Sequence, residues 1–307
     1  MEITVTGVNA ITSPNLQAWD WRLALYLFFG GLSAGVAVMS SILRLTKRGT
    51  AAAGEPARFI APLFVPVILF LGILFVFWDL DRKVNVYWLY LTFKPLSPMS
   101  WGSWGLLMFF PVSVLNALSV LPSELTGYLG FEPLKKLALF LQPHTRLLAV
   151  LNFAVGIFVG TYTGVLLSAF VARPLWNSAI LPLLFLTSAL TGGAAFMIIV
   201  ARQKSVKLFF TKLNLCILVA ELIIMPLFTI SQLISHSHAI MPSFSFAYEY
   251  IVYGLAIAVA LNLLKVKEEE LTEWASRKMM LSSCMVLLGG LILRFSFVYE
   301  GQLSKLI

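Results

Sequence analysis

The chain has 307 residues, of which 59% are hydrophobic and 12% charged, and its formal net charge is +8. Soluble domains are usually about 45–50% apolar and about 25% charged, so this composition excludes an ordinary soluble domain and indicates an integral membrane protein. The positive charge does not indicate a nucleic-acid binder, because the Lys and Arg residues lie mainly in short segments between apolar runs. That placement is typical of membrane orientation.

Apolar stretches long enough to span a bilayer follow one another along the chain. Crossing the hydrocarbon core takes about 20 helical residues, and eight stretches qualify, at about 21–43, 59–78, 99–121, 147–170, 179–201, 213–235, 248–264 and 279–299. A membrane barrel would need alternating segments of about ten residues, which this sequence lacks. We therefore expect an all-α integral membrane protein with a single domain over residues 1–307, built from eight transmembrane helices in two packed four-helix bundles.

The distribution of basic residues predicts the orientation of these spans. The segments after the first, third, fifth and seventh predicted spans hold most of the Lys and Arg residues. Loops rich in Lys and Arg stay in the cytoplasm. The prediction is a multi-pass protein of the cytoplasmic (inner) membrane, with both termini on the outer, periplasmic side.

Polar side chains from separate spans fall close to the predicted outer surface. Ionisable groups at membrane depth are costly and usually face the protein interior or a water-filled cavity. The residues concerned are Trp21, Arg22 and Tyr26 in the first span, Asp79 at the end of the second, Ser100 and Trp101 at the start of the third, Tyr162 in the fourth, and Arg294 in the eighth. Because they share one depth, we expect them to form a common site.

The chemistry of these residues suits a quinone. The ring and tail of a quinone need an apolar slot, and its oxygens need hydrogen-bond donors when oxidised and proton acceptors when reduced. A tyrosine such as Tyr162 can donate, and a carboxylate such as Asp79 can accept a proton. The structural alternative is that Asp79 and Arg294 pair only to stabilise the bundle.

The segment that follows the fourth span contains Arg173, Pro174 and Trp176. Pro174 cannot continue the helix and suits a reversal into the fifth span. By themselves, Arg173 and Trp176 are equally compatible with an interfacial location, as a snorkelling arginine and a tryptophan of the aromatic belt.

Glu221 lies in the middle of the sixth predicted span, in the stretch CILVAELIIM. A functional interpretation is a proton relay between the inner side and the outer site, which would also involve Asp79. The structural alternative is a neutral acid hydrogen-bonded to a neighbouring helix.

The sequence predicts no haem, metal or cluster in this chain. A membrane haem usually takes histidines from within the bundle, but His144 falls on the opposite side of the membrane from His236 and His238 in the predicted topology. Cys216 and Cys284 are too few for a cluster that needs four thiolates.

Four segments resemble the NrfD-like family, the membrane subunits of polysulfide reductases. They are WDWRLALYLFFGGLSAGVAVMSS in the first span, WDLDRKVNVYWLYLTFKPLSPMSWGSW around the second loop, YTGVLLSAFVARPLWNSAILPLLFLTSALTGG across the fourth and fifth spans, and LGGLILRFSFVYEGQ near the end. The resemblance covers nearly the whole chain, and the segment that begins with Tyr162 is the most specific. The sequence departs from the family where Asp81-Arg82-Lys83 stands in place of Gly-Arg-Pro.

The resemblance implies a membrane subunit of a respiratory oxidoreductase that reacts with menaquinone or ubiquinone. It further implies a four-cluster iron–sulfur partner on the outer face and a catalytic subunit, often containing molybdopterin, beyond it. Tyr162 would hydrogen-bond a quinone oxygen, and Arg173 with Pro174 would contribute to the docking surface. Two other functions stay open, a proton-coupled membrane transporter and a purely structural membrane anchor.

Overall fold

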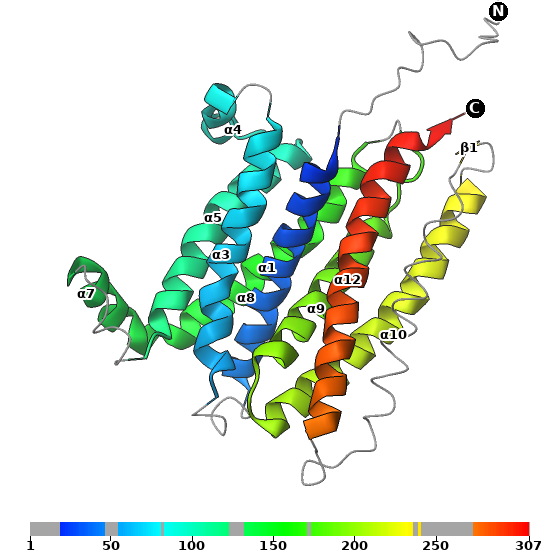
Figure 1. Cartoon of the computed structure of the whole chain (residues 1–307). Helices are drawn as coiled ribbons and strands as arrows, with labels where there is room; N and C mark the ends of the chain where they lie inside the picture. The colour runs from blue at the N-terminus through cyan, green and yellow to red at the C-terminus, as the bar shows by residue number, and fades with distance from the viewer. Residues whose placement is uncertain are drawn as a thin grey trace, which may run out of the picture.

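The computed structural model describes residues 19–46, 55–80, 83–122, 132–170, 173–235, 239–240 and 273–306. The elements in these ranges are α1 (Trp21–Leu45), α3 (Ala57–Asp79), η1 (Lys83–Tyr87), α4 (Trp88–Leu91), α5 (Pro98–Ser119), α7 (Glu132–Leu141), η2 (Gln142–His144), α8 (Thr145–Ser168), α9 (Leu181–Val200), α10 (Lys204–Ser235), β1 (Ala239–Ile240), α12 (Glu273–Leu303) and β2 (Lys305–Leu306). The two strands are short and pair antiparallel. The architecture is therefore a bundle of helices (Figure 1).

Seven helical segments in the described part of the chain are long and apolar enough to cross a membrane, the fourth of them being α7 and α8 taken together. The chain is thus a multi-pass membrane protein. Seven of the predicted spans fall on these segments, and the remaining one, at about 248–264, lies outside the described residues. The eighth helix and the two four-helix bundles stay predictions.

Two helices begin earlier than the sequence pattern predicted. α10 begins at Lys204 and α12 at Glu273, whereas the apolar runs begin at about 213 and 279. The charged residues between these points end the hydropathy signal but not the helix, because Lys, Glu and Arg are good helix formers. Hydropathy therefore located the membrane-spanning part of each helix and missed its extension.

The helices alternate in direction and give the bundle two distinct ends. One end, here called the α4 end, holds the starts of α1, α5 and α9 and the ends of α3, α8, α10 and α12 (Figure 1). The opposite end is called the α7 end. The start of α1 and the end of α12 both lie at the α4 end. The chain therefore enters the first described span and leaves the last one on the same side of the membrane.

The helix α1 lies at the centre and packs against α3, α8, α9 and α12. Small residues allow this close packing. A Cβ on Gly35 would lie 1.8 Å from the carbonyl oxygen of Ala189, and a Cβ on Gly193 would lie 2.2 Å from the carbonyl carbon of Gly35. The backbones of α1 and α9 are therefore in direct contact, as in other membrane helices that meet through glycines.

Candidate functional site

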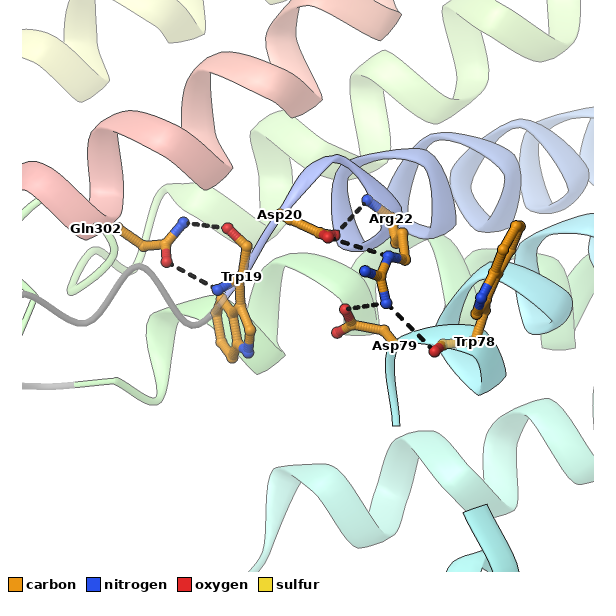
Figure 2. A network of polar contacts seen from close by, with 6 residues as sticks. All are labelled: Trp19, Asp20, Arg22, Trp78, Asp79 and Gln302. Carbon is orange, nitrogen blue, oxygen red and sulfur yellow. Dashed lines mark hydrogen bonds and ion pairs between the residues drawn. The ribbon is translucent and has the colours of Figure 1, made fainter. Parts of the chain in front are cut away.

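An ion-pair cluster joins the start of α1 to the end of α3 at the α4 end (Figure 2). Asp20 caps α1, with its Oδ1 accepting from the Arg22 backbone nitrogen at 2.8 Å. The Arg22 Nε lies 3.0 Å from Asp20 Oδ2, and its Nη1 lies 3.8 Å from Asp79 Oδ1. The same Nη1 donates to the Trp78 carbonyl oxygen at 3.4 Å. Arg22 thus holds two carboxylates from separate helices at one place.

The indole of Trp21 lies beside this cluster, with its ring centroid 6.0 Å from the Arg22 Cζ. It is 41% exposed and meets Phe75 and Trp78 edge-on, with ring centroids 6.0 and 6.4 Å apart. Trp21 therefore belongs to the outer surface of the α1–α3 contact rather than to its interior.

Tyr26 on α1 and Tyr162 on α8 are two buried tyrosines near the α4 end. Each residue is 5% exposed. The ring of Tyr162 lies directly on the backbone of α5, because a Cβ on Gly102 would lie 1.7 Å from both its Cζ and its Oη. Neither hydroxyl forms a hydrogen bond with any residue that the structure describes. Two largely buried tyrosines therefore each have a hydroxyl that can donate to a ligand.

Ser100 and Trp101 shape the turn that precedes this contact. The Ser100 hydroxyl accepts from the Lys94 backbone nitrogen at 3.0 Å, and the Trp101 indole nitrogen donates to the Pro95 carbonyl oxygen at 2.6 Å. Ser100 is buried, whereas Trp101 is largely exposed. Because their polar groups bond locally, their structural effect is to fix the start of α5, and with it Gly102 beneath Tyr162.

Arg294 lies deeper, among α1, α9 and α12. Its side chain is buried, its Nη2 donates to the Phe185 carbonyl oxygen at 3.1 Å, and its Cζ lies 3.8 Å above the Phe185 ring. A small cavity of about 10 Å³, lined in part by Ser188 and Arg294, adjoins it and has room for about one water molecule. Asp79 Oδ1 lies 3.8 Å from Arg22 Nη1, and the structural pairing of Asp79 with Arg294 stays a prediction.

Glu221 is fully buried in α10 and contacts α9. Its Oε2 lies 3.2 Å from the Thr191 hydroxyl, which also lies 2.9 Å from the Ser188 carbonyl oxygen, and the single hydroxyl proton can be donated to one of the two at a time. The structure thus contains the hydrogen bond to a neighbouring helix that the structural alternative requires. It also places Thr191 and Ser188 between Glu221 and the small cavity beside Arg294.

The loop before α9 differs from the interfacial prediction. Trp176 is 3% exposed and its indole nitrogen donates to the Phe297 carbonyl oxygen at 2.7 Å, so it is a buried residue and not a member of an aromatic belt. The Arg173 Nη1 donates to the carbonyl oxygens of Gln302 and Ser304 at 2.6 and 3.1 Å. Both side chains therefore attach the loop to the end of α12.

Sequence reasoning missed the partner of this loop, Gln302. Its side-chain amide donates to the Trp19 carbonyl oxygen at 2.7 Å and accepts from the Trp19 backbone nitrogen at 2.9 Å (Figure 2). The Trp19 ring stacks on Trp176 with centroids 5.0 Å apart. The segments WDW, LWN and YEGQ contain Trp19, Trp176 and Gln302, respectively. No pattern in these segments indicates that the three residues lie together in the fold.

The side chains at the α4 end do not have the composition of a metal site. Within the described ranges, no group of three or more His, Cys, Asp or Glu is placed to hold a metal ion. His236 and His238 lie outside the described residues. The side chains gathered at the α4 end are instead phenols, an arginine and carboxylates, which bind organic oxygens by hydrogen bonds.

Comparison with known proteins identifies the family of this chain. The family model described as polysulphide reductase, NrfD, matches residues 9–304. The sequence is 34% identical to the C chain of the polysulfide reductase of Wolinella succinogenes, over 60% of this protein and 58% of that one. It is 27% identical to protein NrfD of Escherichia coli over 93% and 95% of the two proteins. It is 29% identical to the C subunit of the tetrathionate reductase of Salmonella typhimurium over 65% and 54%. The chain therefore belongs to the polysulphide reductase NrfD family.

Proposed function

We propose that this chain is the quinone-reactive membrane subunit of an oxidoreductase complex. The observation that carries the proposal is the pair of largely buried tyrosines, Tyr26 and Tyr162, whose hydroxyls form no hydrogen bond with any described residue. A phenol hydroxyl without a protein partner can donate a hydrogen bond to a ligand oxygen. A quinone carbonyl would be such an acceptor, so the residues present fit this ligand.

The neighbouring residues supply the remaining requirements of such a site. When bound, a quinone would accept two electrons and two protons, and its reduced form, the quinol, would release them. Tyr162 donates a hydrogen bond to one ring oxygen, and Asp79 exchanges protons with the solvent at the α4 end. Arg22 holds Asp79 in place from 3.8 Å. Trp21 closes the outer side, and Ser100 and Trp101 hold the start of α5 against Tyr162.

The partners follow from the relatives and from the chemistry of the site. The similar proteins include one subunit of a polysulfide reductase and one of a tetrathionate reductase. We propose that this chain likewise joins a complex, with a four-cluster iron–sulfur subunit docked at the α4 end and a catalytic, molybdopterin-containing subunit beyond it. On this proposal the α4 end faces the periplasm and the chain lies in the cytoplasmic membrane.

Proton transfer through the interior is a separate part of the proposal. Glu221, Thr191 and Ser188 form a short polar line toward the cavity beside Arg294. We propose that this line is part of a path that relays protons between the inner side of the membrane and the quinone. Glu221→Gln keeps the size and the hydrogen-bonding capacity of the side chain but cannot ionise. It should leave quinone binding unchanged and lower any proton translocation, and unchanged translocation would remove Glu221 from the mechanism.

The main experiment uses Tyr162→Phe in the complex purified through a tag on this chain. Removing one hydrogen-bond donor to a reacting oxygen typically costs about 10²–10³-fold in rate, so quinone-linked turnover should fall by about 100-fold while the complex still assembles. Tyr299→Phe is the matched control, since Tyr299 is 44% exposed on α12 and loses the same hydroxyl. Full turnover of Tyr162→Phe would refute the site. Substrate uptake into vesicles by the chain alone would favour the transporter instead, and a complex insensitive to added quinone would favour the structural anchor.

A further inference from the structure

A second cavity lies at the α7 end of the bundle, away from the two tyrosines. Its volume is about 570 Å³, and it is bounded by the end of α1, the start of α3, the region following α5 and the start of α8. The charged residues that line it are Arg44, Arg58, Arg146 and Glu55, and its apolar wall includes Phe59 and Val120. This location and lining are independent of the proposed quinone site.

The cavity carries an excess of positive charge. The carboxylate of Glu55 is buried and accepts from the backbone nitrogens of Arg202 and Gln203 at 2.7 and 2.6 Å. Within the described ranges, none of the three lining arginines forms an ion pair. Glu55 is therefore occupied in joining α3 to the α9–α10 turn, and among the described residues the three arginines have no ion-pair partner.

The guanidinium of Arg44 shows most clearly that hydrogen-bond acceptors are lacking among the described residues. Its Nη2 donates to the Asn116 Oδ1, but its Nε and Nη1 are buried without a hydrogen-bond partner among the described residues. Arg44 and Arg58 also line the same cavity, so two like charges border one space. Buried guanidinium donors without partners are costly. An anion in the cavity would offset both the like charges and the missing acceptors.

The neighbouring helix α7 indicates the depth of this cavity in the membrane. Ala138 and Leu141 of α7 pack against Leu118 and Leu148, while Phe140 on the other face is 68% exposed. A short helix with one face on the protein and an exposed aromatic residue is typical of the membrane interface. The cavity residues Pro143, Thr145 and Arg146 follow α7 directly, so the cavity lies at the level of lipid headgroups.

We propose that this cavity binds a phosphate group, with Arg44, Arg58 and Arg146 as the cationic donors. Guanidinium groups match phosphate oxygens in pairs of parallel hydrogen bonds, and basic pockets between membrane helices bind anionic headgroups. Two sources share this chemistry, the headgroup of an anionic phospholipid and free inorganic phosphate. A volume of about 570 Å³ also accommodates the glycerol of a lipid against Phe59 and Val120.

The test is lipid titration of the purified full-length chain, followed by native mass spectrometry. The probes are phosphatidylglycerol, phosphatidylcholine and inorganic phosphate, the last as a competitor. Phosphatidylglycerol should bind at least about tenfold more tightly than phosphatidylcholine, and Arg58→Gln with Arg146→Gln should remove at least about tenfold of that affinity. Retention of lipid in the presence of phosphate identifies the lipid as the ligand, whereas displacement by phosphate identifies the free ion.

The control removes two positive charges from the same end of the bundle outside the cavity, by Lys135→Gln with Lys136→Gln on α7. This control should keep the preference for phosphatidylglycerol. Equal losses in both double variants would show general surface attraction and overturn the proposal, as would equal binding of both lipids by the unchanged protein. If the arginine double variant fails to elute as a single species, Arg146→Gln alone, at an exposed residue, is measured in the same way. An unchanged affinity in that variant would remove Arg146 from the site and contradict the proposal.

Discussion

Gly102→Ala should disable the proposed quinone site without removing any polar group. A Cβ at this position would lie 1.7 Å from the Cζ and Oη of Tyr162, whereas carbon atoms in contact normally lie about 3.5–4.0 Å apart. The phenol must therefore move away by about 2 Å. A displacement of about 1 Å in a catalytic site can already cost 100-fold in rate. We expect quinone-linked turnover to fall by about 100-fold or more.

The fold should survive this substitution. Overpacking costs about 1–3 kcal/mol, but alanine is favoured over glycine in a helix interior by about 1 kcal/mol. The assay is binding of a short-tailed quinone to the purified chain, followed by tryptophan fluorescence, with turnover measured on the assembled complex. Gly192→Ala is the control, because its Cβ would meet Leu32 at an ordinary 3.4 Å. Normal quinone binding by Gly102→Ala would refute the assignment of Tyr162.

Three further predictions concern the contacts that hold the bundle together. Gly35→Ala should force α1 away from α9, because its Cβ would lie 1.8 Å from the Ala189 carbonyl oxygen. We expect the free energy of unfolding in detergent to fall by about 3 kcal/mol or more, and stability equal to that of Gly192→Ala would contradict this contact. Glu55→Ala removes the acceptor of the Arg202 and Gln203 backbone nitrogens and should cost about 1.5–3 kcal/mol in the same assay; an unchanged unfolding midpoint would show that water replaces the carboxylate. Arg22→Gln should change the free energy of unfolding by less than about 1 kcal/mol, because the Arg22 side chain that forms both ion pairs is 33% exposed to solvent. A larger loss would mean that Arg22 supports the fold beyond its pairing with Asp20 and Asp79.

The membrane-spanning segments could be predicted because hydropathy is a local property of the chain. An apolar helix in lipid satisfies its own backbone hydrogen bonds, so each described span falls on a run of apolar residues. The residues 204–212 show the limit of this signal, since Lys204, Lys207 and Lys212 end the apolar run while the helix α10 includes them. Hydropathy reports where lipid surrounds a helix and says nothing about how far the helix continues in water.

The content of the candidate site could also be predicted in part. The sequence indicated that Arg22, Tyr26, Asp79 and Tyr162 share one depth, because counting residues along helices of known rise gives depth directly. It could not separate the Arg22–Asp79 pair from the two buried tyrosines, or place Arg294 beside Phe185. Residues at one depth still differ in the direction that they face, and that direction depends on contacts with other helices.

The sequence by itself determined that this protein spans a membrane, where seven of its membrane-spanning helices lie and which of the described polar residues lie near one end. Only the tertiary structure decided that Trp176 is buried, that Gly102 carries the ring of Tyr162, and that Gln302 joins Trp19 to α12. The physical reason is that the rotation of each helix about its axis is fixed by close contacts between small residues on different helices, such as Gly35 and Gly193. Those contacts connect positions far apart in the chain, and no local pattern of residues specifies them.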